Sequence, residues 1–339
     1  MTADSRGVHD TLVLTRSDVE AVLDMNACIT AVEAAFRAHA EGATLPPGVL
    51  GTHVPGGGFH VKTAGLVTHD GAHGYFVTKT NANFPSNPAQ RGLPTVQGVV
   101  SLHDSIDGSL LALIDSMEIT TLRTAAATAV AARHLARADA RVITVIGCGV
   151  QGRSQLHALT CVRHVGRVFA WDVDREAAER YATAMSERHA LDVVAVADYR
   201  DAVMKSDVVV TCTPSHIPLL AAADVPAGCF VAGVGADSDD KHELAPDLLA
   251  RGIVVADVLE QCARIGDLHH ALAAGAMRRD DVHAELADVV SGRLPGRRSP
   301  DEVTVFDSTG TALEDVAAAV IVYERALAAR RGMRIRLGD

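Results

Sequence analysis

The chain has 339 residues, of which 48% are hydrophobic, 22% charged and 4% aromatic. This composition excludes a disordered chain and fits one large or two medium globular domains. Acidic side chains outnumber basic ones by 42 to 31, for a formal net charge of -11, which argues against nucleic acid or an anionic membrane as the partner. Neither the polar N-terminus nor any later apolar run has the pattern of a signal peptide or a spanning helix. We therefore expect a cytosolic protein that acts on a small molecule.

Cysteine and histidine positions give no sign of a metal centre or a disulfide framework. The six cysteines stand singly, without a CxxC pair, and several lie in apolar runs where a thiol packs as a small hydrophobic group. The sixteen histidines form no HExxH or similar spacing. We expect no disulfide bond and no bound metal ion.

Lysine is rare in this chain. It occurs only at Lys62, Lys79, Lys205 and Lys241, and the remaining 27 of the 31 basic residues are arginines. These lysines are candidates for positions where a compact ammonium and a planar guanidinium are not interchangeable.

The N-terminal third predicts a helix followed by several strands. Apolar residues recur at helical spacing over 18–41, after a possible capping box of Ser17 and Glu20 and before Gly42. Over 49–114 the runs GGFHVKTAGL, GYFVTKTN, TVQGVVSLHD and SLLALIDS are separated by Gly, Pro, Asn and Asp. This pattern is typical of strands joined by turns and predicts an antiparallel sheet packed on a helix.

The rest of the chain predicts a second domain of a different class. An alanine-rich helix over 120–138 leads into apolar runs such as RVITVI, DVVVTC, CFVAGVG and VTVF, which alternate with helical segments. Such runs are typical of parallel strands buried on both faces of a doubly wound α/β sheet. The last predicted helix, 311–330, is long enough to return to the first domain. We therefore predict one domain of residues 1–120 with 318–339 and another of residues 121–317.

A glycine-rich turn follows the first strand of this second domain. The pattern GxGxxG comes directly after RVITVI and opens a helix, and its residues are Gly147, Cys148, Gly149, Val150, Gln151 and Gly152. Gly147 permits the tight turn, Gly149 lets the backbone approach a pyrophosphate, and Gly152 allows close helix packing. The helix N-terminus adds N–H groups and the positive end of its dipole. These residues predict a dinucleotide site, and a tight turn without nucleotide is the alternative.

An acidic residue is expected at the end of the next strand, where it accepts hydrogen bonds from the adenosine ribose. Asp172 in VFAWDVD stands 25 residues after Gly147. Its carboxylate would repel a 2′-phosphate, so the sequence favours NAD(H) over NADP(H). Asp174 is a second candidate for this role, and Arg175 is close enough to complicate the preference.

Five ordered blocks of the sequence resemble the ornithine cyclodeaminase/mu-crystallin family over nearly the whole chain. They read RGLPTVQG, ITTLRTAAATAVAARHLA, VIGCGVQG, VGADSDDKHEL and VFDSTGTALEDVAAAVIVYERA. The resemblance implies a Rossmann-type domain, here residues 121–317, that binds NAD(H). It also implies that the smaller α+β domain, residues 1–120 with 318–339, binds substrate and forms a homodimer through its sheet.

The resemblance assigns catalytic and substrate-binding residues as well. Lys79 in YFVTKTN matches the family's substrate lysine, and Arg123 in TLRTAA matches the arginine that holds the substrate α-carboxylate. The residues alone leave open a solvated strand lysine and an arginine paired with Glu118. Asp237 in GADSDDKHEL matches the catalytic aspartate, which takes a proton from the substrate amine or stabilises an iminium. An ordinary loop aspartate is the alternative for this position.

Further positions match residues around the ligands of the family. Lys241 matches a lysine near the cofactor, and Thr213 and Ser308 match positions near the nicotinamide or its ribose. Thr95 matches a position in the same neighbourhood, and we assign it to substrate binding.

One departure from the family pattern concerns the substrate. Ornithine cyclodeaminases carry a further arginine after the first helix, in a segment that here reads LPPGVLGTHVP and contains no basic residue. Lys62 in FHVKTAGL is the nearby alternative, and strand alternation puts it on one face with His60 and Ala64. We therefore expect Lys62 to contact substrate, and the departure argues against ornithine itself.

The function implied by the resemblance is chemistry at the α-carbon of a small amino acid. Hydride transfer from that carbon to NAD⁺ gives an imine, which a cyclodeaminase then closes onto the substrate's own side-chain amine with loss of ammonia. Among the reactions of the family, the family name alone favours this deaminating cyclisation. An amino-acid dehydrogenase or cyclic ketimine reductase is the alternative, because the same residues serve both. A protein that binds nucleotide and a small acid without turnover, like mu-crystallin, is the alternative of another class.

Overall fold

The computed structural model describes residues 10–68 and 72–337, which divide into two compact units. Unit 1 contains residues 1–123 and 311–339, and unit 2 contains residues 124–310. The second boundary predicted from the sequence, 317/318, falls inside the last long helix, which the structure keeps whole in unit 1. None of the helices in the described residues is long and apolar enough to span a bilayer.

Unit 1 is built on a seven-stranded sheet in the order β15-β1-β6-β5-β4-β3-β2. Its neighbouring strands are antiparallel except for β1 and β6, which run parallel. The strands are β1 Thr11–Leu14, β2 Thr44–Val54, β3 Gly57–Val67, β4 Gly74–Asn83, β5 Val96–Asp104, β6 Leu110–Asp115 and β15 Met333–Ile335. Sequence analysis missed the short β1 and β15, which pair with each other from opposite ends of the chain.

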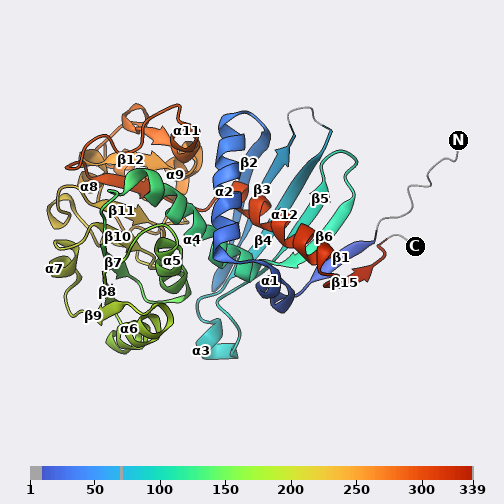
Figure 1. Ribbon diagram of the computed structural model, residues 1–339, viewed down its shortest axis with the longest axis horizontal. Coiled ribbons are helices and arrows are strands. Elements are labelled where there is room, and N and C mark those ends of the chain that lie inside the picture. The colour runs from blue at the N-terminus through green and yellow to red at the C-terminus, as the bar shows by residue number, and fades with distance from the viewer. Residues whose placement is uncertain (1–9, 69–71, 338–339) are drawn as a thin grey trace, which may run out of the picture. The chain divides into compact units, whose positions relative to one another are not determined.

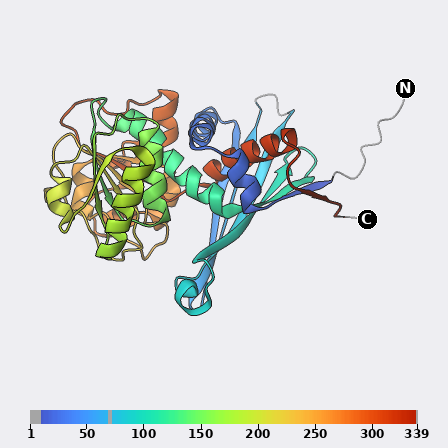
Figure 2. The same ribbon diagram turned by 60° about the horizontal axis from the view of Figure 1, so that its bottom comes forward.

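Helices cover one face of this sheet. Figures 1 and 2 show α1, α2 and α12 on the same side of it, and α12 contacts β3, β4 and β5. The bounds of these three helices are α1 Arg16–Val22, α2 Met25–Ala40 and α12 Ala312–Ala328. Two further helices are α3 Asn87–Arg91 and α4 Ser116–Leu135. The boundary between the units falls within α4.

The helix predicted over 18–41 is two helices, so that prediction is wrong in detail. The chain leaves the helical conformation at Asp24, whose side chain accepts a hydrogen bond from Ala27 N and thereby caps the start of α2. The capping box of α1 is formed by Thr15 and Asp18, two residues before the pair predicted from the sequence. Polar residues at adjacent positions are equally good capping candidates, so composition alone cannot choose the register.

Unit 2 is an eight-stranded sheet in the order β13-β12-β14-β11-β10-β7-β8-β9, in which every strand pair is parallel (Figure 1). β10, β11 and β14 are buried at every position, as expected when helices cover both faces. The strands are β7 Val142–Ile146, β8 Arg167–Trp171, β9 Asp192–Ala195, β10 Val208–Thr211, β11 Phe230–Gly233, β12 Ile253–Ala256, β13 Ala284–Glu285 and β14 Thr304–Asp307. The predicted fold class, a doubly wound parallel sheet with a smaller α+β part, is confirmed.

The helices of unit 2 connect successive strands. They are α5 Val150–Thr160, α6 Arg175–His189, α7 Tyr199–Val203, α8 Pro246–Arg251, α9 Leu259–Ile265, α10 Asp267–Ala273 and α11 Leu286–Ser291, with 3₁₀ turns at Ala222–Asp224 and Arg279–Asp281. The strand order reverses between β7 and β10, since β8 and β9 lie on one side of β7 and the later strands lie on the other. Open parallel sheets bind ligands beyond the carboxyl ends of the strands at such a reversal.

Candidate functional site

Two buried lysines face each other across adjacent strands of unit 1. Lys62 in β3 and Lys79 in β4 are directly paired in the antiparallel register. Their exposed fractions are 6% and 2%. Both belong to a group that we call the cation cluster, whose charged members are Lys62, Lys79, Arg123, Glu314 and Asp315.

The carboxylates of the cation cluster come from the first turn of α12. Asp315 accepts a hydrogen bond from Lys79 Nζ at 2.8 Å and pairs with Arg123 Nε at 2.9 Å. Glu314 accepts from Arg123 Nη1 at 2.6 Å. Thr311 caps the helix and forms a capping box with Glu314, which fixes where this turn begins. The sequence analysis missed Glu314 and Asp315, although two adjacent acids directly before the apolar run 316–322 are a signal for buried cationic partners.

Burial and mutual charge shift the pKa values inside the cation cluster. Burial lowers the pKa of Lys79 to about 7, and the positive charges of Arg123 and Lys62 act in the same direction while Asp315 opposes them. Burial by itself would raise the pKa of Asp315, but Arg123 and Lys79 outweigh it and hold that pKa below its ordinary value. Asp315 is therefore an anion, and Lys79 is close to its protonation midpoint at neutral pH.

Asn81 connects β4 to the helix that carries Arg123. It lies on the same strand face as Lys79 because the two are two residues apart. Its Oδ1 accepts from Ser116 Oγ at 2.6 Å, and its Nδ2 donates to Thr120 Oγ1 at 3.5 Å. A Cβ at Gly98 would lie 2.0 Å from Asn81 Oδ1, so this approach requires glycine. Asn81, which the sequence analysis also missed, thus fixes α4 against the strand.

Thr95 does not lie within the cation cluster. It precedes β5, where its carbonyl accepts from Phe84 N at 2.8 Å. Since Lys79 pairs with Val100, Thr95 is displaced by five strand positions, roughly 16 Å along the strand. Its predicted contact with substrate remains a prediction.

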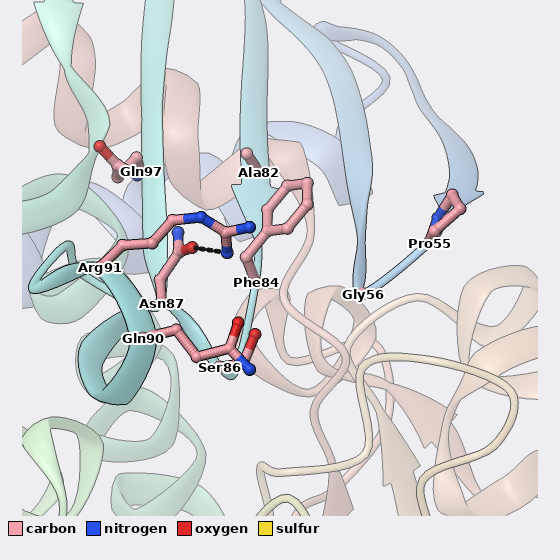
Figure 3. Close-up of a pocket in the computed structure, with 9 residues that line it drawn as sticks. All are labelled: Pro55, Gly56, Ala82, Phe84, Ser86, Asn87, Gln90, Arg91 and Gln97. Carbon is pink, nitrogen blue, oxygen red and sulfur yellow. Dashed lines mark hydrogen bonds between the residues drawn. The ribbon is translucent and has the colours of Figure 1, made fainter.

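A pocket of about 420 Å³ lies beside α3 in this same part of unit 1 (Figure 3). Figure 3 shows Arg91 and Asn87 side by side, joined by a hydrogen bond of 3.1 Å from Arg91 Nη1 to Asn87 Oδ1. Two residues that line the pocket, Ala82 in β4 and Gln97 in β5, lie opposite each other in the sheet. Side chains alternate between the two faces of a strand, so Ala82 lies on the face opposite to Lys79. The pocket is therefore separate from the cation cluster.

In unit 2 the glycine turn has the backbone geometry that its pattern predicts. Gly147 has φ +105°, and a Cβ there would lie 2.8 Å from Cys212 O. A Cβ at Gly152 would lie 2.1 Å from Gly147 O, so helix and strand approach closely at this point. Gly149, the N-cap of α5, has open space where a Cβ would stand. The α5 N-terminus is thus accessible to a ligand.

A pocket of about 510 Å³ opens at the reversal of strand order. Its lining includes the predicted cofactor residues Gly147, Gly149, Asp172 and Thr213. Two apolar side chains in the lining, Val173 and Ile217, are 89% and 70% exposed, and the other lining residues are Trp171, Cys212, Pro214, Ser215 and Leu219. The predicted residues Val150 and Gln151 belong to the first turn of α5, directly after Gly149. The pocket therefore combines N–H donors, a carboxylate and exposed apolar side chains.

The backbone holds Asp172 in this pocket. Its carboxylate accepts from Cys148 N at 2.8 Å and from Asp174 N at 3.0 Å. Asp174, the other candidate for ribose binding, caps α6 by accepting from Glu176 N. Arg175 forms an ion pair with Glu179 on the same helix. These contacts favour Asp172 over Asp174 as the group that faces a ligand.

Glu243 joins the loop after β10 to the loop after β11. Its Oε1 accepts from Thr213 N and Oγ1 at 2.6 and 2.7 Å, and its Oε2 accepts from Thr211 Oγ1 and Gly235 N at 2.8 and 2.7 Å. Glu243 is fully buried, which raises the pKa of its carboxyl. The sequence analysis missed this residue, although it stands two residues after Lys241 in a block that the analysis singled out.

Asp237 and Lys241 form an ion pair in the loop after β11. Lys241 Nζ donates to Asp237 Oδ1 at 2.5 Å, and the Asp237 side chain is 48% exposed. Burial opposes the charged form of Lys241, but the carboxylate of Asp237, together with those of Glu243 and Asp240, outweighs it and raises the pKa of that lysine. Ser308 directly follows the neighbouring strand β14 and is 1% exposed. Asp237, Thr213 and Ser308 thus follow the carboxyl ends of three consecutive strands.

Behind these loops lies a second charged group, the acid cluster, composed of Glu243, Asp257, Asp267 and Asp307. All four side chains are fully buried. Asp257 accepts from Thr309 N and Gly310 N, and Asp267 Oδ1 accepts from Glu243 N and Leu244 N. Asp307 accepts from Leu268 N at 2.9 Å. Backbone N–H groups are therefore the main partners of these carboxylates.

A family model now places the chain among known proteins. The model of the ornithine cyclodeaminase/mu-crystallin family matches residues 9–330. The chain belongs to this family. An alanine dehydrogenase of Archaeoglobus fulgidus is 38% identical over 328 residues, which cover 96% of this chain and 98% of that protein. The resemblance inferred from the sequence blocks is thereby confirmed.

Solved structures agree with this membership over the whole chain. An archaeal alanine dehydrogenase dimer with bound NAD superposes with a TM-score of 0.92 at 36% identity, covering 97% of this chain and 100% of that one. The Thermococcus litoralis Δ1-pyrroline-2-carboxylate reductase in complex with NADH and L-proline gives a TM-score of 0.90 at 30% identity, covering 96% and 100%.

Proposed function

We propose that this protein is an NAD(H)-dependent enzyme that interconverts a small α-amino acid and its imine. The observation that carries this proposal is the buried network in which Asp315 holds both Lys79 and Arg123. Burying such a network costs desolvation energy, so the network is not explained by a gain in stability alone. It does hold cationic side chains in fixed positions, where they can bind a carboxylate. An α-amino-acid dehydrogenase or imine reductase needs such a site for the α-carboxylate of its substrate.

The pocket of unit 2 fits a dinucleotide. The open space at Gly149 and the α5 N-terminus suit a pyrophosphate, and Asp172 suits the ribose hydroxyls. Val173 and Ile217 offer apolar surface for an adenine ring. The nicotinamide, when bound, supplies the hydride acceptor or donor. Asp172 favours NAD(H), since its charge repels a 2′-phosphate.

Charge decides the substrate class within this proposal. The cation cluster brings the basic side chains of Lys62, Lys79 and Arg123 together in one buried place. These side chains suit the α-carboxylate of a substrate as a partner. The side-chain ammonium of ornithine would gain no such partner from them. We therefore assign an amino acid with an uncharged side chain, and dehydrogenation or imine reduction over deaminating cyclisation.

Protons are moved by side chains of this chain. The neutral amine of Lys79 accepts a proton from the substrate ammonium in the oxidative direction, and its protonated form donates one to the imine in reverse. The pKa of Lys79 near 7 suits both roles at neutral pH. Asp237, held by Lys241, stabilises the positive charge that develops on the substrate nitrogen. We also propose a homodimer, since the archaeal relative is one.

The test is an assay of the purified protein with NAD⁺ and a panel of amino acids. Accumulation of NADH with alanine or another neutral amino acid supports a dehydrogenase, and NADH oxidation with a cyclic imino acid supports a reductase. Ammonia release without net NADH supports cyclisation instead. Ligand binding without turnover of any panel member would overturn the enzyme proposal in favour of a binding protein.

The cofactor assignment has its own test. Asp172→Ser removes the carboxylate and is expected to shift the ratio of kcat/KM values towards NADP by about tenfold. Asp174→Ser is the matched control, because Asp174 caps α6. It should leave the cofactor preference unchanged. An unaltered preference in Asp172→Ser would remove Asp172 from the ribose site.

A further inference from the structure

Histidine side chains hold the loop that carries Asp237 and Lys241. His270 Nε2 in α10 lies 2.8 Å from the carbonyl oxygen of Lys241, and His216 Nδ1 in the loop after β10 lies 2.9 Å from that of Asp240. A carbonyl oxygen can only accept a hydrogen bond, so each of these ring nitrogens donates. Two consecutive carbonyls of the loop are therefore held by histidines from different parts of unit 2.

Two further histidines confine the ring of His270. The rings of His242 and His270 are stacked, with their centroids 3.9 Å apart and their planes at 12°. His242 Nε2 donates to the carbonyl oxygen of Leu244 at 3.0 Å, which fixes the His242 ring against its own segment of the chain. Burial and then His270 lower the pKa of His242, so the stack does not carry two positive charges at neutral pH. His269 meets His270 edge-on, with 5.2 Å between the ring centroids.

The helix that carries His270 also holds the residues after Lys241. Asp267 and His270 are three residues apart in α10 and therefore lie on the same face of that helix. Asp267 Oδ1 accepts from Glu243 N at 2.8 Å and from Leu244 N at 2.9 Å. One face of α10 thus holds the backbone of this segment at three successive residues.

Lys241 links this backbone contact to the side chain of Asp237. Its carbonyl accepts from His270, and its Nζ forms the ion pair with Asp237 four residues earlier. The Lys241 side chain is 19% exposed, whereas that of Asp237 is 48% exposed and can meet a ligand. A shift in the backbone at Lys241 would carry its ammonium away from Asp237. The orientation of the Asp237 carboxylate therefore depends on where α10 holds Lys241.

We propose that His270 is a positioning residue for the ion pair of Asp237 and Lys241: its Nε2–H group holds the Lys241 carbonyl, and the stacked His242 ring keeps His270 in the orientation that this contact needs. This inference rests on the proposed function, in which Asp237 stabilises positive charge on the substrate nitrogen. A neutral imidazole suits this place because it donates a hydrogen bond without adding a second cation beside Lys241. His270 acts through Lys241 and not on the reacting atoms.

The scarcity of lysine makes the ion pair measurable without a substrate. Protein labelled with [6-¹³C]lysine has four ε-carbon signals, one for each lysine, and Lys241→Arg identifies the signal of Lys241. Burial opposes the ammonium, but nearby carboxylates, chiefly Asp237, raise the pKa of Lys241 above the ordinary 10.5. His270→Leu removes the donor and should lower this midpoint by about 0.5–1 unit, because the ion pair loosens. His270→Gln retains an N–H donor and should keep the midpoint near the wild-type value.

Matched substitutions of other histidines control this measurement. His283 Nε2 donates to a backbone carbonyl oxygen at the same distance of 2.8 Å, and His283→Leu should leave the Lys241 midpoint unchanged. The stack is tested by comparing His242→Phe with His242→Ala. Both variants lose the donor to Leu244, but only phenylalanine keeps a ring against His270. The midpoint should therefore stay closer to the wild-type value in His242→Phe.

Steady-state kinetics distinguish positioning from a general structural defect. In His270→Leu we expect kcat to fall by about 10- to 30-fold, because Asp237 is no longer held in place. KM for NAD⁺ should stay within about twofold, since Gly149 and Asp172, which the proposed function assigns to the cofactor, are unchanged. His270→Gln should restore kcat to within about threefold of wild type. A structural defect would affect both variants alike and raise KM for the cofactor as well.

The outcomes separate the inference from the proposed function. A Lys241 midpoint that His270→Leu leaves unmoved, or that His270→Leu and His270→Gln lower equally, overturns the inference. The wild type alone gives a second test if a variant does not fold: long-range ¹H–¹⁵N correlation should show neutral His270 as the Nε2–H tautomer, and the Nδ1–H tautomer would overturn the inference. If the midpoints and tautomer are as expected but the wild type turns over no member of the amino-acid and imino-acid panel, the proposed function is wrong and the positioning of Lys241 by His270 stands.

Discussion

Each unit buries a cluster of charged side chains, but the two clusters are stabilised in different ways. In the cation cluster of unit 1, side chains neutralise one another, as where Asp315 holds both Lys79 and Arg123. In the acid cluster of unit 2, the carboxylates accept hydrogen bonds from backbone N–H groups and hydroxyls. Among the residues that the structure describes, no cationic side chain forms an ion pair with Asp257, Asp267 or Asp307. The first arrangement therefore depends on partner side chains, whereas the second depends mainly on the backbone.

The two clusters also respond to pH in opposite directions. The pKa of Lys79 is about 7 in the folded protein against an ordinary 10.5, so between these values only the unfolded chain binds the proton and stability rises with pH. Burial raises the pKa of Asp307 from an ordinary 3.8 to about 7. Between those values the folded chain holds the proton, so stability falls as pH rises. Unit 1 is thus adapted to release a proton, and unit 2 to retain one.

The largest expected effect comes from breaking the cation cluster. Asp315→Ala leaves Lys79 and Arg123 buried without the carboxylate that they share. We expect a loss of about 3–5 kcal/mol in the free energy of unfolding of unit 1. Urea unfolding followed by far-UV circular dichroism measures this loss. Fluorescence of the single tryptophan, Trp171, reports on unit 2 and should change less.

Glu179→Gln is the matched control for this loss. It removes one carboxylate of an exposed ion pair with Arg175 on α6, for which we expect less than about 1 kcal/mol. Equal losses in the two variants would contradict the view that the members of the cation cluster depend on one another.

The same contrast explains what could be predicted from the sequence. The dinucleotide turn is contiguous in the chain, so the strand, Gly147, Gly149 and the helix could be recognised together, and Asp172 follows at the end of the next strand. The parallel sheet followed from apolar runs that are buried on both faces. These features depend on local sequence and on the period of the strands.

The residues that complete the buried clusters were not predicted. Asp315 is 236 positions from Lys79, so only the tertiary fold brings them together. Glu243 is held partly by backbone N–H groups, which every residue has, so its role could not be inferred from its partners although it stands in a block that the sequence analysis singled out. The short strands β1 and β15 were missed for a similar reason, since each pairs with a segment distant in the chain.

A smaller effect is expected where the acid cluster supports the loops of unit 2. Glu243→Gln replaces an acceptor by an amide NH₂ that must face the backbone N–H of either Thr213 or Gly235. One loop is then held less firmly, and we expect kcat to fall by about 10- to 100-fold, together with a loss of about 1–3 kcal/mol in the free energy of unfolding. Glu285→Gln is the control, since Glu285 accepts from Leu259 N through one oxygen, which glutamine retains. Unchanged kcat in Glu243→Gln would show that the loops do not need this carboxylate.

The smallest effect sharpens the contrast in pH response. Asp267 Oδ2 has no hydrogen-bond partner among the residues that the structure describes, and burial followed by the charge of Asp307 raises the pKa of Asp267. Asp267→Asn places an uncharged amide there and keeps Oδ1 for Glu243 N and Leu244 N. Its stability relative to wild type should therefore increase as the pH rises above 3.8, the ordinary pKa of an aspartate, by about 1–2 kcal/mol. Urea unfolding at several pH values, followed by Trp171 fluorescence, measures this difference.

Asp257→Asn is the control that separates charge from hydrogen bonding. Both oxygens of Asp257 accept hydrogen bonds, with Oδ2 between Thr309 N and Gly310 N at 2.7 Å each and Oδ1 accepting from Val258 N at 2.6 Å. An amide nitrogen at either position must face a backbone N–H, so this variant should lose stability at every pH. A pH-independent loss in Asp267→Asn as well would mean that its carboxylate is needed as an acceptor, and that the acid cluster does not retain a proton in the way its burial implies.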